Sequence, residues 1–197
     1  LKVTLWLPAA FGAWYYLSIV HVAPSAWLSD AVLAGFFPEV FSSVRQSGNL
    51  LEIDTVIDAS VIGNTAAGGG TIAFDINPLI YGYGLPLLTG LILASPGEIE
   101  NKIFKVLGGG LILLPFQVWG VSFDALKTVY FSLGQGVAVQ AYQGGGLPPD
   151  VVALGYQLGF LILPAVAPIL VWIGMHSDFI RVLAPRFGPQ SPPSSPS

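Results

Sequence analysis

The sequence contains no cysteine, few charged residues and only 2 histidines, and each shortage excludes a class of function. Without cysteine there is no disulfide framework, no cysteine-based zinc site and no thiol nucleophile. Charged residues make up 9% of the chain, whereas soluble domains carry roughly 25%. Lys and Arg together number 7 and the net charge is −4, which argues against nucleic acid as a partner. With 53% hydrophobic residues and a mean hydropathy of +0.72, the sequence instead predicts a membrane protein.

Four apolar stretches approach the ~20 residues that a helix needs to cross a ~30 Å hydrocarbon core. They cover residues 3–23, 79–95, 103–133 and 150–175, the third with an extension beyond its apolar part. The first resembles a signal peptide at its end, His21-Val22-Ala23, but Pro24 follows and its apolar core is unusually aromatic. We therefore expect residues 3–23 to be kept as a membrane anchor, in an all-α membrane bundle of about four transmembrane helices.

The distribution of Lys and Arg predicts the orientation, because these residues favour cytoplasmic loops. With the N-terminus inside, the cytoplasmic side holds Lys2, Lys102, Lys105, Arg181 and Arg186, and only Arg45 and Lys127 lie elsewhere. Both termini are then cytoplasmic and the loop 24–78 lies outside. The Pro/Ser-rich end at 188–197 is predicted to be a disordered tail.

The loop 24–78 is long enough to hold a small folded unit. Apolar residues at helical spacing over 25–37 predict an amphipathic helix on the outer membrane surface, ended by Pro38. Apolar and polar residues then alternate with a period of two at 40–44, 51–58 and 71–77, which is typical of half-buried strands. The predicted fold is thus the helical bundle with a small extracytoplasmic three-stranded antiparallel β subdomain.

Two charged residues, Asp124 and Lys127, stand near or within the third apolar stretch. Gln117, Gly120, Asp124 and Lys127 are spaced 3-4-3 and share one helix face. Ionisable residues at membrane depth usually pair and mark functional sites. The alternative is an ordinary i,i+3 ion pair on an interfacial helix, worth a few tenths of a kcal/mol. An enzymatic interpretation would make Asp124 a base, but no second catalytic group is placed to assist it.

No metal or cofactor site is expected. The acidic residues Glu52, Asp54 and Asp58 alternate along a predicted strand and lack the glycine-containing loop of an EF-hand. His21 and His176 fall at opposite ends of the predicted bundle.

Prolines interrupt the second, third and fourth apolar stretches, at Pro86, Pro115, Pro164 and Pro168. Broken helices can open a cavity in transporters, but they are also tolerated as simple kinks in bundles. Gln157 shares a face with Pro164 and Pro168 on a regular helix, so we expect it to face another helix rather than lipid.

Three strings of the sequence resemble the small membrane proteins called exosortase H-associated: residues 75–88 (DINPLIYGYGLPLL), 117–127 (QVWGVSFDALK) and 153–168 (ALGYQLGFLILPAVAP). The resemblance extends from about Trp6 to Arg181. It implies a bacterial inner membrane and a genomic partnership with an exosortase, an enzyme that processes proteins carrying a C-terminal sorting helix. It implies no catalytic residue. Exosortases are thought to use a cysteine, which this chain lacks.

The leading hypothesis is therefore a non-catalytic accessory protein of an exosortase system, with the loop 24–78 in the periplasm. Its expected partners are the lipid bilayer and an exosortase or its sorting-signal substrate. Residues predicted to contact other helices or a partner are Asp75, Asn77, Tyr81, Tyr83, Gln117, Trp119, Asp124, Lys127, Tyr156 and Gln157. The second hypothesis is a small transporter or lipid-handling protein, which a water-filled or lipid-sized cavity reaching Asp124 would favour.

Overall fold

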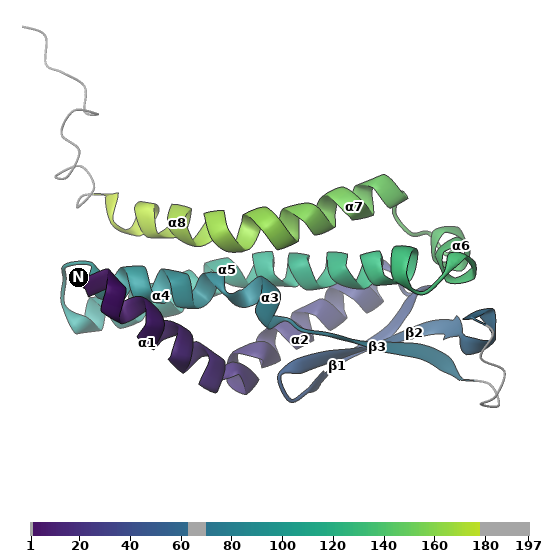
Figure 1. The fold of residues 1–197 in the computed structure, drawn as a ribbon, viewed down its shortest axis with the longest axis horizontal. Coiled ribbons are helices and arrows are strands. Elements are labelled where there is room, and N and C mark those ends of the chain that lie inside the picture. Colours follow the sequence, from purple (N-terminus) through teal and green to yellow (C-terminus); the bar gives the residue numbers. More distant parts are fainter. Residues whose placement is uncertain (1, 63–69, 178–197) are drawn as a thin grey trace, which may run out of the picture.

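The computed structural model describes residues 2–62 and 70–177. The predicted tail at 188–197 and the two C-terminal arginines lie outside the described residues. Two helices precede one small sheet, and the rest of the described chain is helical (Figure 1). The helices are α1 (Lys2–Tyr16), α2 (Ser18–Phe36), α3 (Leu79–Gly82), α4 (Gly84–Ala94), α5 (Ile99–Lys127), α6 (Gln135–Gln143), α7 (Pro149–Gln157) and α8 (Leu163–Met175), with 3₁₀ turn η1 (Ala59–Ile62) and π-helical segments η2 (Thr128–Ser132) and η3 (Leu158–Ile162).

The predicted three-stranded antiparallel sheet is confirmed. Strands β1 (Phe41–Ser47), β2 (Leu50–Asp58) and β3 (Thr71–Ile76) lie in the order β1-β2-β3, and Ile53 pairs with Val44 on one side and with Phe74 on the other. Gly48 takes a φ of +64° in the turn between β1 and β2, a conformation that glycine adopts without steric cost. Alternate β2 residues are buried under α2 and α5, which explains the period of two.

The N-terminal region differs from the predicted span at 3–23 followed by a separate helix at 25–37. The helix breaks at Leu17, and α2 then continues without interruption through Pro24 to Phe36, so that α1 and α2 form a V (Figure 1). A proline ring crowds the carbonyl four residues before it, here that of Val20. The turn just before that carbonyl is tight, with the Val20 amide donating to the Leu17 oxygen at 3.0 Å. Pro24 also lacks an amide hydrogen, yet α2 continues through it, and the break lies seven residues earlier, at Leu17.

Three helical segments are long and apolar enough to cross a membrane within the described part of the chain: Ser18–Phe36, Ile99–Ser132 and Pro149–Met175. The sequence predicted about four. The difference arises because Leu17 divides the first predicted stretch and because the apolar run Leu79–Ala94 is short and changes helix at Tyr83. The third and fourth predicted segments, 103–133 and 150–175, are continuous helical runs. The third ends in the π-helical segment η2, and the fourth contains the π-helical segment η3 between α7 and α8.

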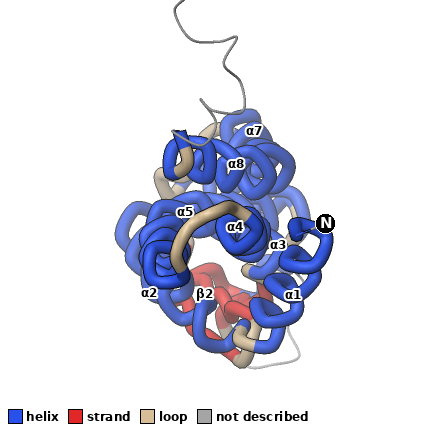
Figure 2. The backbone as a smooth tube through the Cα atoms, turned by 90° about the vertical axis from the view of Figure 1, so that its left-hand side faces the viewer, coloured by secondary structure: helices blue, strands red, loops and turns tan. Residues whose placement is uncertain are grey.

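Helix α5 is the central element of the molecule (Figures 1 and 2). The α7–η3–α8 run packs along one side of α5, and α3 and α4 pack along another. Helix α1 packs against α4, and α2 joins the sheet to α5. Asp30 of α2 fixes this junction, since its carboxylate accepts a hydrogen bond from the Val44 amide of β1 at 2.7 Å. The sheet thus lies beside one half of α5, and α4 and α8 pack along the other half.

Candidate functional site: a polar and aromatic junction between α3, α5 and α7

The helices α3, α5 and α7–η3 meet where glycine leaves room for aromatic side chains. Gly120 of α5 lies against the ring of Tyr81 from α3, so closely that a Cβ atom at this position would clash with the ring. One helical turn earlier, the Gln117 side chain donates from Nε2 to the Pro78 carbonyl at 3.3 Å. A Cβ atom on Gly82 would stand 2.8 Å from the same nitrogen. The short helix α3 is therefore held against α5 by close contact and one buried hydrogen bond.

Asp124 and Lys127 form the charged part of this junction. Lys127 Nζ lies 3.8 Å from Asp124 Oδ1, and the side chains are 34% and 17% exposed respectively. The same nitrogen lies 5.2 Å from the centroid of the Tyr156 ring on α7, which is a cation–π distance. The Tyr81 hydroxyl lies near the side chains of Asp124 and Tyr156. Three helices thus contribute to one small polar group in which the charges face each other while part of Lys127 stays exposed.

Aromatic rings surround this polar group. Tyr156 stacks on Phe160 with ring centroids 5.7 Å apart and planes 10° apart, and Phe160 meets Tyr81 edge-on at 6.4 Å. On the neighbouring turn of α5, Trp119 stacks on Phe123 at 4.6 Å. The Trp119 indole donates from Nε1 to the Gly155 carbonyl of α7 at 3.0 Å. This bond crosses between the two long helical segments and fixes their relative position.

The structure gathers six of the ten predicted residues at the junction: Tyr81, Gln117, Trp119, Asp124, Lys127 and Tyr156. The other four lie elsewhere. Asp75 is exposed on β3, and Asn77 Oδ1 accepts a hydrogen bond from the Leu79 amide at 3.0 Å at the start of α3. Tyr83 is half-buried between α3 and α4.

Gln157 does not share the buried face of Pro164 and Pro168, as a regular helix would require, but is exposed. The π-helical segment η3 lies between Gln157 and α8. A π-turn contains more residues than an α-turn, so the faces before and after it no longer align.

The sequence analysis missed Phe160 and the glycines Gly155 and Gly159. A Cβ atom on Gly155 would clash with the Phe123 ring, and one on Gly159 would stand 3.0 Å from the Gly120 Cα atom. The signal was present as Gly155-x-x-x-Gly159 within an apolar stretch, a spacing typical of close helix packing in membranes. Tyr156 and Phe160 are likewise i,i+4 neighbours on a helix.

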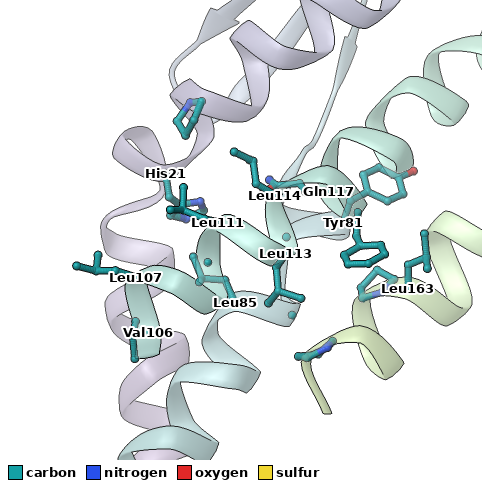
Figure 3. Close-up of a pocket in the computed structure, with 17 residues that line it drawn as sticks. His21, Tyr81, Leu85, Val106, Leu107, Leu111, Leu113, Leu114, Gln117 and Leu163 are labelled. Atoms are coloured by element: carbon teal, nitrogen blue, oxygen red, sulfur yellow. The ribbon is translucent and has the colours of Figure 1, made fainter. Parts of the chain in front are cut away.

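A cavity of about 540 Å³ lies beside the junction, among α2, α3, α4, α5 and α8 (Figure 3). Tyr81 and Gln117 belong to both the junction and the cavity wall, whereas Asp124 does not line the cavity. The rest of the wall is almost entirely aliphatic. Among the residues that the structure describes, no group of three or more His, Asp or Glu side chains is placed to hold a metal ion.

Comparison with known proteins gives the family. The profile of the family described as exosortase H-associated membrane protein matches residues 1–179, which is most of the chain. No curated protein and no solved structure matches the chain. The strings noted in the sequence at 75–88, 117–127 and 153–168 all lie inside the matched range. Each of the three contributes residues to the junction of α3, α5 and α7. The chain belongs to the family of exosortase H-associated membrane proteins.

Proposed function

We propose that this protein is a non-catalytic accessory subunit of a bacterial exosortase system, and that it contacts the exosortase or its sorting-signal substrate through the junction of α5 and α7. The family match supports the association with an exosortase. The absence of cysteine from the sequence supports a role other than that of the sorting enzyme.

The observation that carries the choice of surface is the partial exposure of the charged pair. Lys127 is about one-third exposed and Asp124 about one-sixth, on a helix that is long and apolar enough to span the bilayer. Ionisable groups at such positions are costly in lipid and generally face other protein or a water-filled space. Trp119 is 40% exposed beside them, and aromatic side chains are enriched where proteins contact partners. A partner helix covering this face would remove Lys127 from lipid.

We further propose that the sheet faces the periplasm. Lys102 and Lys105 lie in the first two turns of α5, and the start of α5 is at the opposite end of the molecule from the sheet (Figure 1). Lysine near the ends of spans favours the cytoplasmic side. The one arginine of the sheet region, Arg45, is paired with Asp54 at 2.9 Å and also approaches Glu52 at 3.6 Å, so its charge is compensated locally. On this proposal, the N-terminus and the described end of α8 lie in the cytoplasm.

The transporter or lipid-handling alternative predicts a water-filled or lipid-sized cavity that reaches Asp124. The cavity beside the junction ends at Tyr81 and Gln117, and its wall contains few polar groups. A polar solute would therefore leave most of its hydrogen bonds unmade there. We favour the accessory role because the cavity does not reach Asp124 and suits no polar solute.

The proposal is tested by gentle detergent extraction of a tagged chain from its native membrane, followed by mass spectrometry of the proteins recovered with it. The variant Asp124→Ala/Lys127→Ala removes the charged pair. The matched control is Glu100→Ala/Lys105→Ala, which also removes one acidic and one basic residue from α5 but at its other end.

We expect the unmodified chain and the control to recover an exosortase or a sorting-signal protein, and the double variant to recover several-fold less. Each variant is first checked for a normal elution volume and helix content. Equal recovery by all three chains would rule out the proposed surface. Recovery of the chain alone would rule out the accessory role itself.

A further inference from the structure

The cavity beside the junction has walls from five helices. Its lining residues are mainly leucines, prolines and glycines from α2, α3, α4, α5 and α8. Helices α1 and α2 form a V (Figure 1), and two residues near the start of α2, His21 and Pro24, lie in the wall of this space. The glycines line the cavity without filling it, because they have no side chain.

The cavity opens sideways, toward the surroundings of the bundle. Leu107 and Leu111 are 62% and 72% exposed, and Pro24 of α2 is also exposed, although all three line the space. By contrast Leu113 is 8% exposed and lies deeper, near Leu85 (Figure 3). All the α5 lining residues belong to the long apolar segment that can span a membrane. An occupant entering between Leu107 and Pro24 therefore comes from the hydrocarbon region of the bilayer.

The size of the cavity selects among apolar occupants. One turn of an α-helix, about 5.4 Å long and roughly 10–12 Å wide with side chains, takes up on the order of 400–600 Å³. The cavity of about 540 Å³ has room for one such turn, whereas a membrane-spanning helix has about five or six turns. It lies well within the range of roughly 300–1,000 Å³ typical of small-molecule sites. A flexible hydrocarbon chain fits this volume, and a sorting helix does not.

The polar groups of the wall are already engaged or turned away. Gln117 Nε2 donates to the Pro78 carbonyl, and His21 Nε2 lies 3.1 Å from the Trp14 carbonyl oxygen. The Tyr81 hydroxyl lies near Asp124 and Tyr156 of the junction, and neither of these lines the cavity. A ligand therefore meets an almost wholly apolar surface and needs no hydrogen-bonding groups inside.

From these observations we propose that the cavity binds one acyl chain of a bilayer phospholipid, which enters past Leu107 and Leu111 while its headgroup remains outside. The bilayer supplies this ligand at high concentration. The chain end would lie against Leu85, Leu113 and Leu163, deep between α4, α5 and α8. This binding site does not depend on the accessory role, since it requires only the chain and its membrane.

The test uses the purified protein in bilayer nanodiscs that contain phosphatidylcholine with a diazirine at the end of one acyl chain. After irradiation, the modified residues are located by mass spectrometry. Leu114→Trp places a large ring in the cavity, and Ile112→Trp is the matched control, because Ile112 is 50% exposed on the same helix and does not line the cavity. Val106→Phe serves as a second filling variant in case Leu114→Trp does not fold.

We expect adducts on the deep residues Leu85, Leu113 or Leu163 in the unmodified protein and in Ile112→Trp. In the folded filling variant these adducts should fall several-fold, while adducts on exposed surfaces stay the same. Adducts confined to exposed residues, or deep adducts unaffected by filling, would overturn the proposal. Deep adducts from a diazirine-bearing polyleucine helix peptide, and not from the lipid, would overturn it in favour of a helical occupant.

Discussion

Gly159 lies so close to Gly120 that a Cβ atom on Gly159 would stand 3.0 Å from the Gly120 Cα atom. The two glycines bring the backbones of η3 and α5 together, and Gly120 also gives room to the Tyr81 ring. In a bilayer, where lipid is as apolar as leucine, such close packing is a main source of helix association. The junction of α3, α5 and α7 therefore depends on missing side chains as much as on the polar groups that it holds.

Replacing Gly120 by alanine tests this dependence. The new methyl group would collide with the Tyr81 ring, so we expect Gly120→Ala to lower the free energy of unfolding by about 1–3 kcal/mol. Gly108→Ala is the control on the same helix, since a Cβ atom there meets nothing within 4 Å. Alanine is favoured over glycine in a helix by about 1 kcal/mol, so the control should be neutral or stabilising. Unfolding of each variant in detergent micelles, monitored by circular dichroism, gives the two free energies of unfolding. Equal stability of the two variants would contradict the close contact.

The charged pair should show coupling in a double-mutant cycle. Lys127→Ala alone leaves the Asp124 carboxylate without its ion-pair partner at a mostly buried position. Leaving one charge of such a pair unmatched costs more than removing both. We expect Lys127→Ala to destabilise the protein more than Asp124→Ala/Lys127→Ala does, with a coupling free energy of about 1 kcal/mol or less because both side chains keep some solvent contact. Additive effects of the two single variants would show that the pair contributes nothing to stability.

The Trp119 hydrogen bond can be removed while its ring packing is largely kept. Trp119→Phe loses the bond to the Gly155 carbonyl but retains a ring that can stack on Phe123. We expect a loss of about 0.5–1.5 kcal/mol in the free energy of unfolding. Trp27→Phe is the comparison, since Trp27 is 72% exposed and should change stability little. A loss in Trp27→Phe as large as that in Trp119→Phe would mean that ring size, rather than the interhelical bond, is responsible.

The parts of the fold that follow from local periodicity were predictable from the sequence. The alternation in 51–58 identified β2, and the stripe from Gln117 to Lys127 identified the α5 face that carries the junction. The break at Leu17 was not predictable in this way, since the apolar run continues through this position and neither proline nor glycine stands there.

The orientation of Gln157 also escaped prediction. A helical face can be followed along a sequence only while the number of residues per turn stays constant, and η3 changes that number. The contacts of Gly155, Gly159 and Phe160 depend on which helices become neighbours, which a single helix pattern does not give. Their spacing shows only that close packing is possible.

Site-directed photocrosslinking in the native membrane can show whether the junction of α5 and α7 faces an exosortase or its substrate, as we propose. A photoreactive amino acid at Gln157, which is exposed beside Tyr156, should crosslink to an exosortase or a sorting-signal protein. The same photoreactive amino acid at Ile103, which is 53% exposed near the other end of α5, should not crosslink to either protein. No crosslink from Gln157, or equal crosslinking from both positions, would contradict the account.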